Sequence, residues 1–219
     1  MDKNIKNFAI SLMGQNPYEN FETENYSINL SGWNYKHPIF EKLISEIKPK
    51  LILEIGTWLG ASAIHMHNCT LQHGLNTSIL CIDTWLGSHR ILWKNPEFRQ
   101  QLNLKNGFPQ QYYQFLANIK LHSKQNSIFP MPMTSYAATS ILLEENISFD
   151  LIYIDAHHDE IEVKNDINQA WKLLNPGGAI FGDDYRIGER GVIKAVNYFA
   201  AEHGLYLTTN AEKWVLKKD

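Results

Sequence analysis

From about residue 50 onward, the chain alternates between short apolar runs and longer stretches with a helical period. The apolar runs are bounded by turn residues and are rich in Ile, Leu and Phe, which is typical of buried strands. They lie at residues 51–55, 78–83, 126–131, 149–155 and 179–184. Between them, apolar positions recur every three or four residues, which predicts helices near residues 56–74, 110–121, 135–146, 160–175 and 191–204. Strands that alternate with helices predict a parallel sheet with helices on both faces.

The C-terminal end departs from this alternation. Residues 205–209 and 212–218 are two strand-like runs separated by a short polar link, which predicts an antiparallel hairpin. The expected fold class is therefore α/β: a Rossmann-like, doubly wound, mostly parallel seven-stranded sheet with a C-terminal antiparallel hairpin.

The N-terminal region and one long connection lack such a pattern. Residues 1–36 show no clear period, so we expect an irregular N-terminal cap segment over a domain that spans residues 37–219 and begins with a helix at 37–50. The connection between the second and third strands is much longer than usual, and such loops are often functional. We interpret the part around residues 86–109 as a lid-like insertion or substrate wall. The alternative is a surface excursion with a small core of its own.

Composition narrows the class of protein. The chain has 219 residues, 44% of them hydrophobic, which suits one domain with a full core. Its net charge of −3 argues against nucleic acid as a partner. The two cysteines, Cys69 and Cys81, form no C-x-x-C pair, so a zinc site is unsupported. The N-terminal residues lack the pattern of a secretion leader, and the sequence has no apolar run of the ~18 residues that a membrane span needs. We therefore expect a cytoplasmic protein without a membrane partner.

Acidic residues stand at the carboxyl ends of four of the five predicted parallel strands. They are Glu54, Asp83, Asp155 and the pair Asp183 and Asp184. Ligands of doubly wound sheets bind at these ends, near the point where the strand order reverses. Ionised carboxylates that cluster there repel one another unless a cation holds them. The pattern predicts one shared cleft, and the alternative is that the acids only cap turns and helices.

The stretch LEIGTWLGAS (residues 53–62) indicates what that cleft binds. Gly56 makes the turn and Gly60 lets helix and strand approach, but Trp58 stands where a dinucleotide-binding loop needs its second glycine. A pyrophosphate is therefore disfavoured. The amides of the helix N-terminus and the Ser62 hydroxyl suit a carboxylate, and Glu54 suits an adjacent ammonium.

Asp83, at the end of the next strand, is placed to accept hydrogen bonds from two ribose hydroxyls. A ligand that joins an amino acid to a nucleoside is S-adenosylmethionine, which fits both sets of contacts. In the stretches LEIGTWLGAS and IDTW, the sequence resembles class I S-adenosylmethionine-dependent methyltransferases. The segment FDLIYIDAHHDEIEVKNDINQAWKLLNPGGAIFGDDY is similar to the metal-dependent O-methyltransferase subgroup, which contains catechol O-methyltransferase and bacterial sugar and natural-product O-methyltransferases. The resemblance covers residues 50 to 200.

The resemblance implies two sets of ligand-binding residues. Those that would contact S-adenosylmethionine are Glu54, Gly56, Trp58, Gly60, Ser62, Asp83, Trp85, Met133, Thr134 and Asp155. Those that would bind Mg²⁺ or Mn²⁺ are Asp155, Asp183 and Asp184. The third ligand is often Asn in the catechol enzymes, and the Asp of this chain still suits ions that prefer oxygen donors.

Methyl transfer to a hydroxyl requires a positioned acceptor and a base for its proton. His157 and His158 follow Asp155 closely, and His158 matches the histidine of the family pattern. We favour His158 as base or substrate contact, with His157 as the alternative, and we expect one of them to face away from the cleft. A capping role for His158 stays open.

The expected function is divalent-metal-assisted O-methylation of a small hydroxylated molecule, with a sugar or a natural product as the candidate acceptor. One alternative is an N-methyltransferase, although IDAHHD differs from the motif that amino-group methylases use. Another is a non-catalytic or repurposed S-adenosylmethionine-binding domain. A homodimer is compatible with each of these alternatives.

Overall fold

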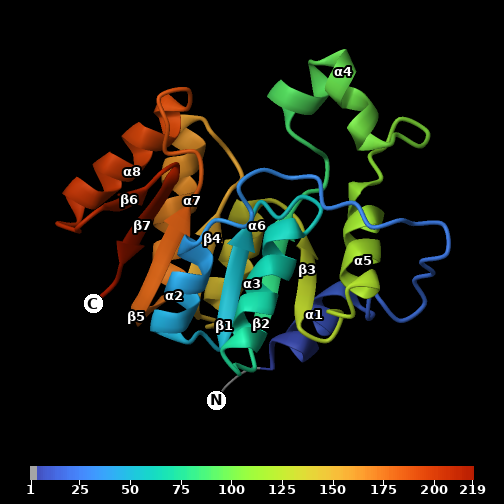
Figure 1. Ribbon diagram of the computed structural model, residues 1–219, viewed down its shortest axis with the longest axis horizontal. Helices are drawn as coiled ribbons and strands as arrows, with labels where there is room; N and C mark the ends of the chain where they lie inside the picture. Colours follow the sequence, from blue (N-terminus) through green and yellow to red (C-terminus); the bar gives the residue numbers. More distant parts are fainter. Residues whose placement is uncertain (1–3) are drawn as a thin grey trace.

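The computed structural model describes residues 4–219, which contain a seven-stranded sheet (Figure 1). The strands, in chain order, are β1 (Leu51–Ile55), β2 (Ser78–Asp83), β3 (Ile128–Pro132), β4 (Phe149–Ile154), β5 (Leu174–Gly182), β6 (Thr208–Asn210) and β7 (Lys213–Lys217). Their order across the sheet is β3-β2-β1-β4-β5-β7-β6. Strands β1 to β5 are parallel, and β7 is antiparallel to both β5 and β6. The predicted fold class is confirmed.

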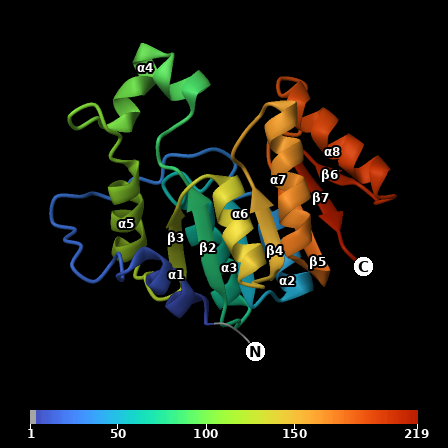
Figure 2. The same ribbon diagram turned by 180° about the vertical axis from the view of Figure 1, so that it is seen from behind.

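Helices cover both faces of this sheet (Figures 1 and 2). One face carries α2 (Ile39–Ile47), α3 (Ala61–Gln72) and α5 (Gln111–Leu121). The opposite face carries α1 (Ile5–Met13), α6 (Ser135–Glu144), α7 (Glu160–Leu173) and α8 (Arg190–Glu202). No helix within residues 4–219 has the length and apolar character needed to cross a membrane.

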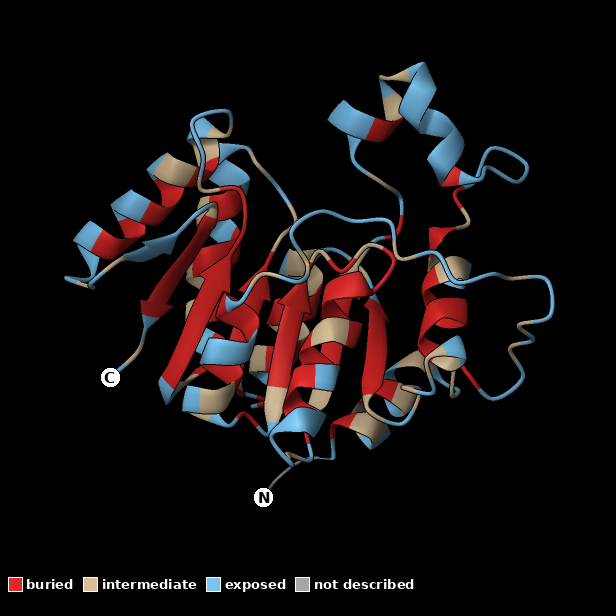
Figure 3. Ribbon diagram, viewed as in Figure 1, coloured by how far each residue is buried: buried red, intermediate tan, exposed pale blue. Residues whose placement is uncertain are grey.

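Two cores form because the central strands are apolar on both sides. Leu53 and Ile55 of β1 pack with α6 and α7, whereas Ile52 packs with α2 and α3. Figure 3 shows the central strands as buried along nearly their whole length. Continuous apolar runs are expected of parallel strands that are covered on both faces.

Two local predictions are wrong. The sequence predicts an irregular N-terminal segment, but that segment contains α1, whose residues Ile5 and Ala9 are buried against the sheet. Asn4 caps α1 by accepting hydrogen bonds from two main-chain amides, and Gly14 ends it in the left-handed region. The strand predicted at residues 179–184 begins earlier, because residues 174–178 already lie within β5, which follows α7 without a loop.

The strand order reverses between β1 and β4, so the carboxyl ends of these two strands flank the switch point. The long connection after β2 rises above this edge of the sheet (Figure 1). It contains a π-helical turn (His89–Trp93), α4 (Pro96–Arg99) and a 3₁₀ turn (Gln100–Leu102). Leu92 and Leu102 are buried within it. The connection therefore has a small core of its own above the expected cleft.

Candidate active site

The turn between β1 and α3 is tied to both neighbouring strands. The Gly56 amide donates to the carbonyl of Ile82 on β2 (2.8 Å), and the Asp155 amide donates to the carbonyl of Ile55 (2.8 Å). Gly56 has a φ of +88°, and an added Cβ would lie 2.2 Å from the Asp155 carbonyl oxygen. Only glycine combines that φ with such close approach. The predicted cofactor turn and the first predicted metal ligand therefore pack directly against each other.

Glu54 holds the inside of this turn. Its side chain is fully buried, with Oε2 accepting from the Thr57 hydroxyl (2.7 Å) and Oε1 accepting from the Ser62 hydroxyl. The Cys81 thiol lies 3.6 Å from Oε2. Burial raises the pKa of Glu54 to about 7, although the two hydroxyl hydrogen bonds oppose the shift. Glu54 and Ser62 were both predicted as cofactor contacts, and the structure brings them together as partners of each other.

Asp83 joins the turn to the end of β2. Its Oδ2 accepts from the Trp58 amide (2.8 Å), and its Oδ1 accepts from the Trp85 amide (2.7 Å). Burial raises the pKa of Asp83, and the amide hydrogen bonds work against that rise. The two loops that would contact the cofactor are thus locked together through one carboxylate.

Trp85 supports this junction from the interior. Its indole Nε1 donates to the Trp58 carbonyl (2.7 Å), and its ring packs against Tyr112 and Phe115 of α5, with centroids 5.0 Å away in both cases. The side chain is only 2% exposed. Trp58 is half-buried and has a φ of +50°. Of the two tryptophans, Trp58 is therefore the one with surface left for a ligand.

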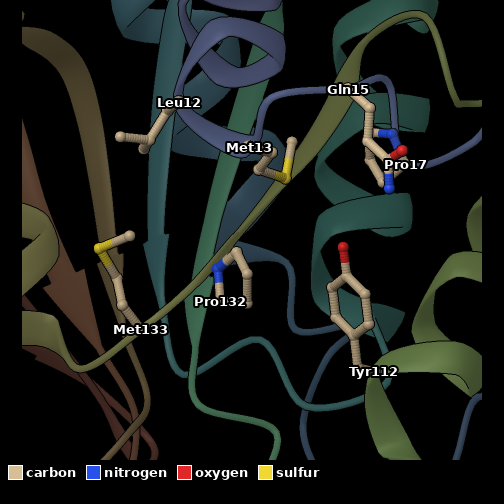
Figure 4. A pocket seen from close by; sticks show the side chains of 7 residues that line it. All are labelled: Leu12, Met13, Gln15, Pro17, Tyr112, Pro132 and Met133. Atoms are coloured by element: carbon tan, nitrogen blue, oxygen red, sulfur yellow. The ribbon is translucent and has the colours of Figure 1, made fainter.

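Met133 and Thr134 follow β3 at the edge of the sheet. Thr134 caps α6, since its hydroxyl accepts from the Ala137 amide (3.3 Å). Met133 is half-buried and lines a cavity of about 300 Å³ between the end of α1, the end of β3 and α5. Figure 4 shows the side chains that line it: Leu12, Met13, Gln15, Pro17, Tyr112, Pro132 and Met133. The structure thus places Met133 beside α1, a helix within the segment that was expected to be irregular.

Asp155 and Asp183 lie at the ends of β4 and β5 and share a buried set of partners. The Tyr153 hydroxyl donates to Asp155 Oδ2 (2.9 Å), and the Lys213 ammonium lies 2.7 Å from Asp183 Oδ2. Burial and the charge of Asp183 raise the pKa of Asp155 to about 6. Oδ1 of Asp183 is buried and has no hydrogen-bond partner among the described residues. A buried carboxylate oxygen without a partner is suited to a cation.

Asp184, the residue after Asp183, has two cationic partners of its own. Its Oδ2 lies 2.9 Å from His158 Nε2, and its Oδ1 lies 3.0 Å from an Arg186 nitrogen. His158 Nδ1 in turn lies 3.4 Å from Glu189 Oε2. The hydrogen bond to Asp184 raises the pKa of His158 to about 9, against the opposing effect of burial. Burial by itself would raise the pKa of Asp184, but its hydrogen bond with His158 brings that pKa below its ordinary value.

The two neighbouring histidines separate in space. His158 faces Asp184, whereas His157 is exposed, with its Nδ1 3.1 Å from Glu162 Oε2 in the first turn of α7. The chain direction at the end of β4 sends consecutive side chains to different sides. His158 is the one that the structure brings to the acidic cluster.

In the part of the chain that the structure describes, two overlapping groups of side chains have the spacing of metal ligands. Ligand atoms of Asp155, His158 and Asp184 lie within 4.8 Å of one another, and so do those of Asp183, Asp184 and Glu212. The predicted set of Asp155, Asp183 and Asp184 is therefore divided between two groups that share Asp184. Oxygen atoms dominate both groups, which suits Mg²⁺ or Mn²⁺ better than softer ions.

A family model described as a methyltransferase domain matches residues 53–185. This range begins just before Glu54 and ends just after Asp184, so it contains the glycine turn, the predicted metal-binding aspartates and His158. The match covers more than half of the chain. The chain belongs to this methyltransferase family. The predicted resemblance to class I S-adenosylmethionine-dependent methyltransferases is thereby confirmed.

Curated relatives of the methyltransferase are longer than it is. The chain is 24% identical over 161 residues to uncharacterized protein y4gI of Sinorhizobium fredii, a match that covers 74% of this chain and 16% of that protein. It is 31% identical over 135 residues to uncharacterized protein R132 of Acanthamoeba polyphaga mimivirus, which covers 61% of this chain and 51% of the relative. The chain thus spans about half or less of the length of these relatives.

Solved structures share the fold of the methyltransferase. The O-methyltransferase NovP superposes with a TM-score of 0.61 at 14% identity, over 82% of this chain and 78% of that one. A putative caffeoyl-CoA O-methyltransferase from Staphylococcus aureus gives 0.60 at 15% identity, over 97% and 99%. An O-methyltransferase from Bacillus cereus in complex with SAH gives 0.56 at 18% identity, over 96% and 89%.

Sequence reasoning missed several partners of the acidic cluster. Lys213 and Glu212 come from the C-terminal hairpin, where lysines stand at both ends of a Lys–Trp–Val–Leu–Lys run and only the first is buried. Tyr153 is predicted only as a strand residue. One usable signal was period two, because Lys213 shares a face of β7 with the buried Val215. The other was the position of the hairpin beside β5, which only the sheet order reveals.

Proposed function

We propose that this methyltransferase transfers a methyl group from S-adenosylmethionine to a hydroxyl of a small molecule, with the help of a divalent ion. One observation carries the proposal: the Gly56 turn packs on the backbone of Asp155, whose carboxylate groups with His158 and Asp184 within 4.8 Å. A methyl donor on the turn and an acceptor at the cluster would then be neighbours. Such proximity is the main requirement of an in-line methyl transfer.

The cofactor would lie along the carboxyl ends of β1 and β2. The amides at the start of α3, next to Gly60, suit the carboxylate of a methionine moiety. Glu54 is fully buried, so it acts by fixing Thr57 and Ser62 rather than by meeting the ligand directly. Asp83 and the exposed part of Trp58 suit the ribose, and Met133 with Thr134 suits the adenine. Trp85 supports this surface from within.

The names of neighbouring structures support transfer to oxygen. NovP is described as an O-methyltransferase, and the protein TomG from Streptomyces achromogenes is described as an O-methyltransferase of tomaymycin synthesis in complex with SAM. The Bacillus cereus enzyme was solved with SAH. A natural product or a sugar is therefore the acceptor class that we propose, and a nucleic acid is not.

The side chains of the cluster fit a hard divalent ion. Asp183 offers a buried oxygen that has no partner within residues 4–219, and the charge of Asp183 contributes to the raised pKa of Asp155. Both features indicate that the negative charge of these aspartates exceeds the positive charge of the side chains that pair with them. Asp155, Asp183 and Asp184 are the residues that would hold Mg²⁺ or Mn²⁺, with Glu212 alongside. Bound there, the ion would lower the pKa of an acceptor hydroxyl and orient it.

His158 is the proposed proton acceptor, with His157 as the alternative. With Asp184 and Glu189 as partners, its pKa of about 9 keeps the imidazole protonated at neutral pH, so it cannot accept a proton in that state. A cation that competes for Asp184 would lower this pKa and free Nε2. His157 pairs with the exposed Glu162 and lies outside the ligand groups.

The other parts of the proposal concern the surroundings of the site. The lid-like insertion around residues 86–109 would close over the acceptor. Its Arg90 already pairs with Asp159, which precedes α7 (3.4 Å). Residues 1–36 would cover the cofactor side as a cap. A cytoplasmic location and a homodimer complete the proposal.

Calorimetry with S-adenosylhomocysteine, with and without Mg²⁺, tests the proposal first. We expect binding in both conditions, and we expect Asp155→Ala to abolish methyl transfer in a screen of hydroxylated acceptors. Its affinity for S-adenosylhomocysteine should stay within about tenfold of the parent, because the loss of a metal ligand acts mainly on the metal. An absence of S-adenosylhomocysteine binding would contradict the methyltransferase proposal. Activity that a chelator leaves unchanged would remove the metal from it.

A further inference from the structure

Lys213 is the most deeply buried cation among the described residues of the site. It begins β7, it is 1% exposed, and its ammonium lies 2.7 Å from Asp183 Oδ2 and 2.8 Å from the Tyr153 hydroxyl. The ring centroids of Phe40 and Tyr153 lie 5.1 Å and 4.9 Å from the same nitrogen. Burying a charge is costly unless it is paired, and here one carboxylate, one hydroxyl and two aromatic faces surround it.

Sheet register brings these groups together. Gly182 of β5 pairs with Trp214 of β7, so the next residues, Asp183 and Lys213, are neighbours across the antiparallel pair. Ile154 of β4 pairs with Gly182 on the other side. The strands β4, β5 and β7 are therefore adjacent in the sheet. Asp155 follows β4, Asp183 follows β5, and Lys213 begins β7. No other lysine among the described residues contacts Asp183.

A chain of hydrogen bonds extends the reach of Lys213 to a second carboxylate. The ammonium donates to the Tyr153 hydroxyl, which leaves that hydroxyl's own hydrogen to donate to Asp155 Oδ2 (2.9 Å). The direction of each bond is fixed, because an ammonium can only donate and an ionised carboxylate can only accept. One lysine thus holds one oxygen of Asp183 directly and one oxygen of Asp155 through Tyr153.

The opposite oxygens are the ones left for a ligand. Oδ1 of Asp183 is buried without a partner among the described residues, and Asp155 belongs to the group with His158 and Asp184. We infer that Lys213 is a positioning residue: it anchors the rear oxygens of Asp183 and Asp155 so that their other oxygens face a divalent cation. This inference rests on the metal-assisted part of the proposed function.

Two effects of Lys213 oppose each other, and their balance can be measured. As a positive charge it repels a divalent ion, so its removal would tighten binding if charge were its main effect. As an anchor it fixes the ligand carboxylates, so its removal would weaken binding. Loss of groups that orient metal ligands typically lowers metal affinity by about 10–100-fold, and the two fixed hydrogen bonds favour the anchoring effect.

The test is Mn²⁺ binding to the full chain, followed by electron paramagnetic resonance of free Mn²⁺. Lys213→Met replaces the lysine by an unbranched apolar side chain and removes the ammonium. We expect about 10–100-fold weaker Mn²⁺ binding. S-adenosylhomocysteine affinity, measured by calorimetry, should change by less than about threefold, because the glycine turn is untouched. Lys217→Met is the matched control on the same strand, since Lys217 is exposed and pairs with Glu46. It should change neither affinity.

Tyr153→Phe tests the hydrogen-bond chain from Lys213 through Tyr153 to Asp155 without removing the buried charge of Lys213. It removes only the hydroxyl that links Lys213 to Asp155, and we expect weaker Mn²⁺ binding than in the parent. If Lys213→Met does not fold, Mn²⁺ binding by Tyr153→Phe tests the inference by itself. Unchanged or tighter Mn²⁺ binding in a folded Lys213→Met, or unchanged binding in Tyr153→Phe, would overturn the inference while the proposed function stands. A parent protein that binds S-adenosylhomocysteine but not Mn²⁺ would overturn both the inference and the metal-assisted step.

Discussion

The imidazole of His158 and the carboxylate of Asp184 form an ion pair, with Nε2 2.9 Å from Oδ2. The two residues come from the loops after β4 and β5, which are neighbouring parallel strands. Glu189, just before α8, faces the second nitrogen of the ring at 3.4 Å. In protonated His158, each ring N–H therefore faces one acid. The hydrogen bond to Asp184 is the main reason that the pKa of His158 rises to about 9.

This pairing predicts a pH-dependent contribution to stability. The pKa of His158 is about 9 in the folded state against 6.5 for an ordinary histidine, so the stabilisation is complete below about pH 6.5 and is lost as pH rises through 9. One pKa unit corresponds to about 1.4 kcal/mol, so the difference in unfolding free energy between the parent and His158→Gln should shrink by up to about 3 kcal/mol across that range. Chemical denaturation without divalent ions measures it. His157→Gln is the control, and a pH-independent difference for His158→Gln would contradict the pairing.

The raised pKa of Glu54 predicts that the protein loses stability as the pH rises from about 4.5 to about 7. Its pKa is about 7 in the folded state against 4.5 for an ordinary glutamate, so the folded state holds its proton more tightly than the unfolded chain. Its contribution is most favourable below about pH 4.5 and is lost as pH rises through 7. Glu54→Gln cannot ionise, so its stability relative to the parent should increase by up to about 3 kcal/mol between these limits. Thermal or urea unfolding at a series of pH values checks this, and a constant difference would show that Glu54 is not the titrating group.

Gly56→Ala should destabilise the fold and abolish S-adenosylhomocysteine binding. Its φ of +88° disfavours any other residue, and the new Cβ would meet the Asp155 carbonyl oxygen at 2.2 Å, so the junction of β1 and β4 must open. Left-handed strain alone costs about 1–2 kcal/mol, and the forced shift of main chain adds to it. Gly74→Ala is the matched control, because Gly74 has a φ of +66° with no atom within 4 Å of the added Cβ. Urea unfolding and calorimetry distinguish the two. Equal losses of stability would refute the close contact.

Asp83→Asn should weaken S-adenosylhomocysteine binding by about 10–100-fold. The carboxylate accepts from two amides, one in each loop, and an Asn side chain has only one oxygen with which to accept. A lost hydrogen bond to a charged group costs about 1.5–3 kcal/mol, and here it releases either the Trp58 or the Trp85 loop. Calorimetry gives the affinity.

Asp150→Asn is the control for this change. Asp150 also accepts from main-chain amides, those of Lys50 and Leu51, but it lies at the opposite end of the sheet. It should lower stability without changing the affinity for S-adenosylhomocysteine. If Asp83→Asn behaved in the same way, Asp83 would be structural and not part of the cofactor site.

Local patterns were sufficient to predict the architecture of this protein. Each central strand is a continuous apolar run because it is covered on both faces, and each helix of the predicted alternation carries its own apolar stripe. The apolar residues of α1 do recur at helical spacing, at Ile5, Phe8, Ala9, Leu12 and Met13. The helix went unpredicted because the rest of the first 36 residues has no clear period. The start of β5 went unpredicted because Pro176 and the two glycines normally end an element, yet here they lie within the strand, with Pro176 and Gly177 exposed.

The sequence by itself determined that acids stand at the ends of parallel strands, beside a turn shaped by Gly56 and Gly60. Chain direction and the fixed topology of doubly wound sheets are enough to bring such ends to one edge. Only the tertiary structure decided which partner each acid takes. Lys213 reaches Asp183 because β7 inserts next to β5, and His158 rather than His157 reaches Asp184. Those choices depend on strand order and side-chain direction between segments that are distant in sequence, and no local pattern encodes them.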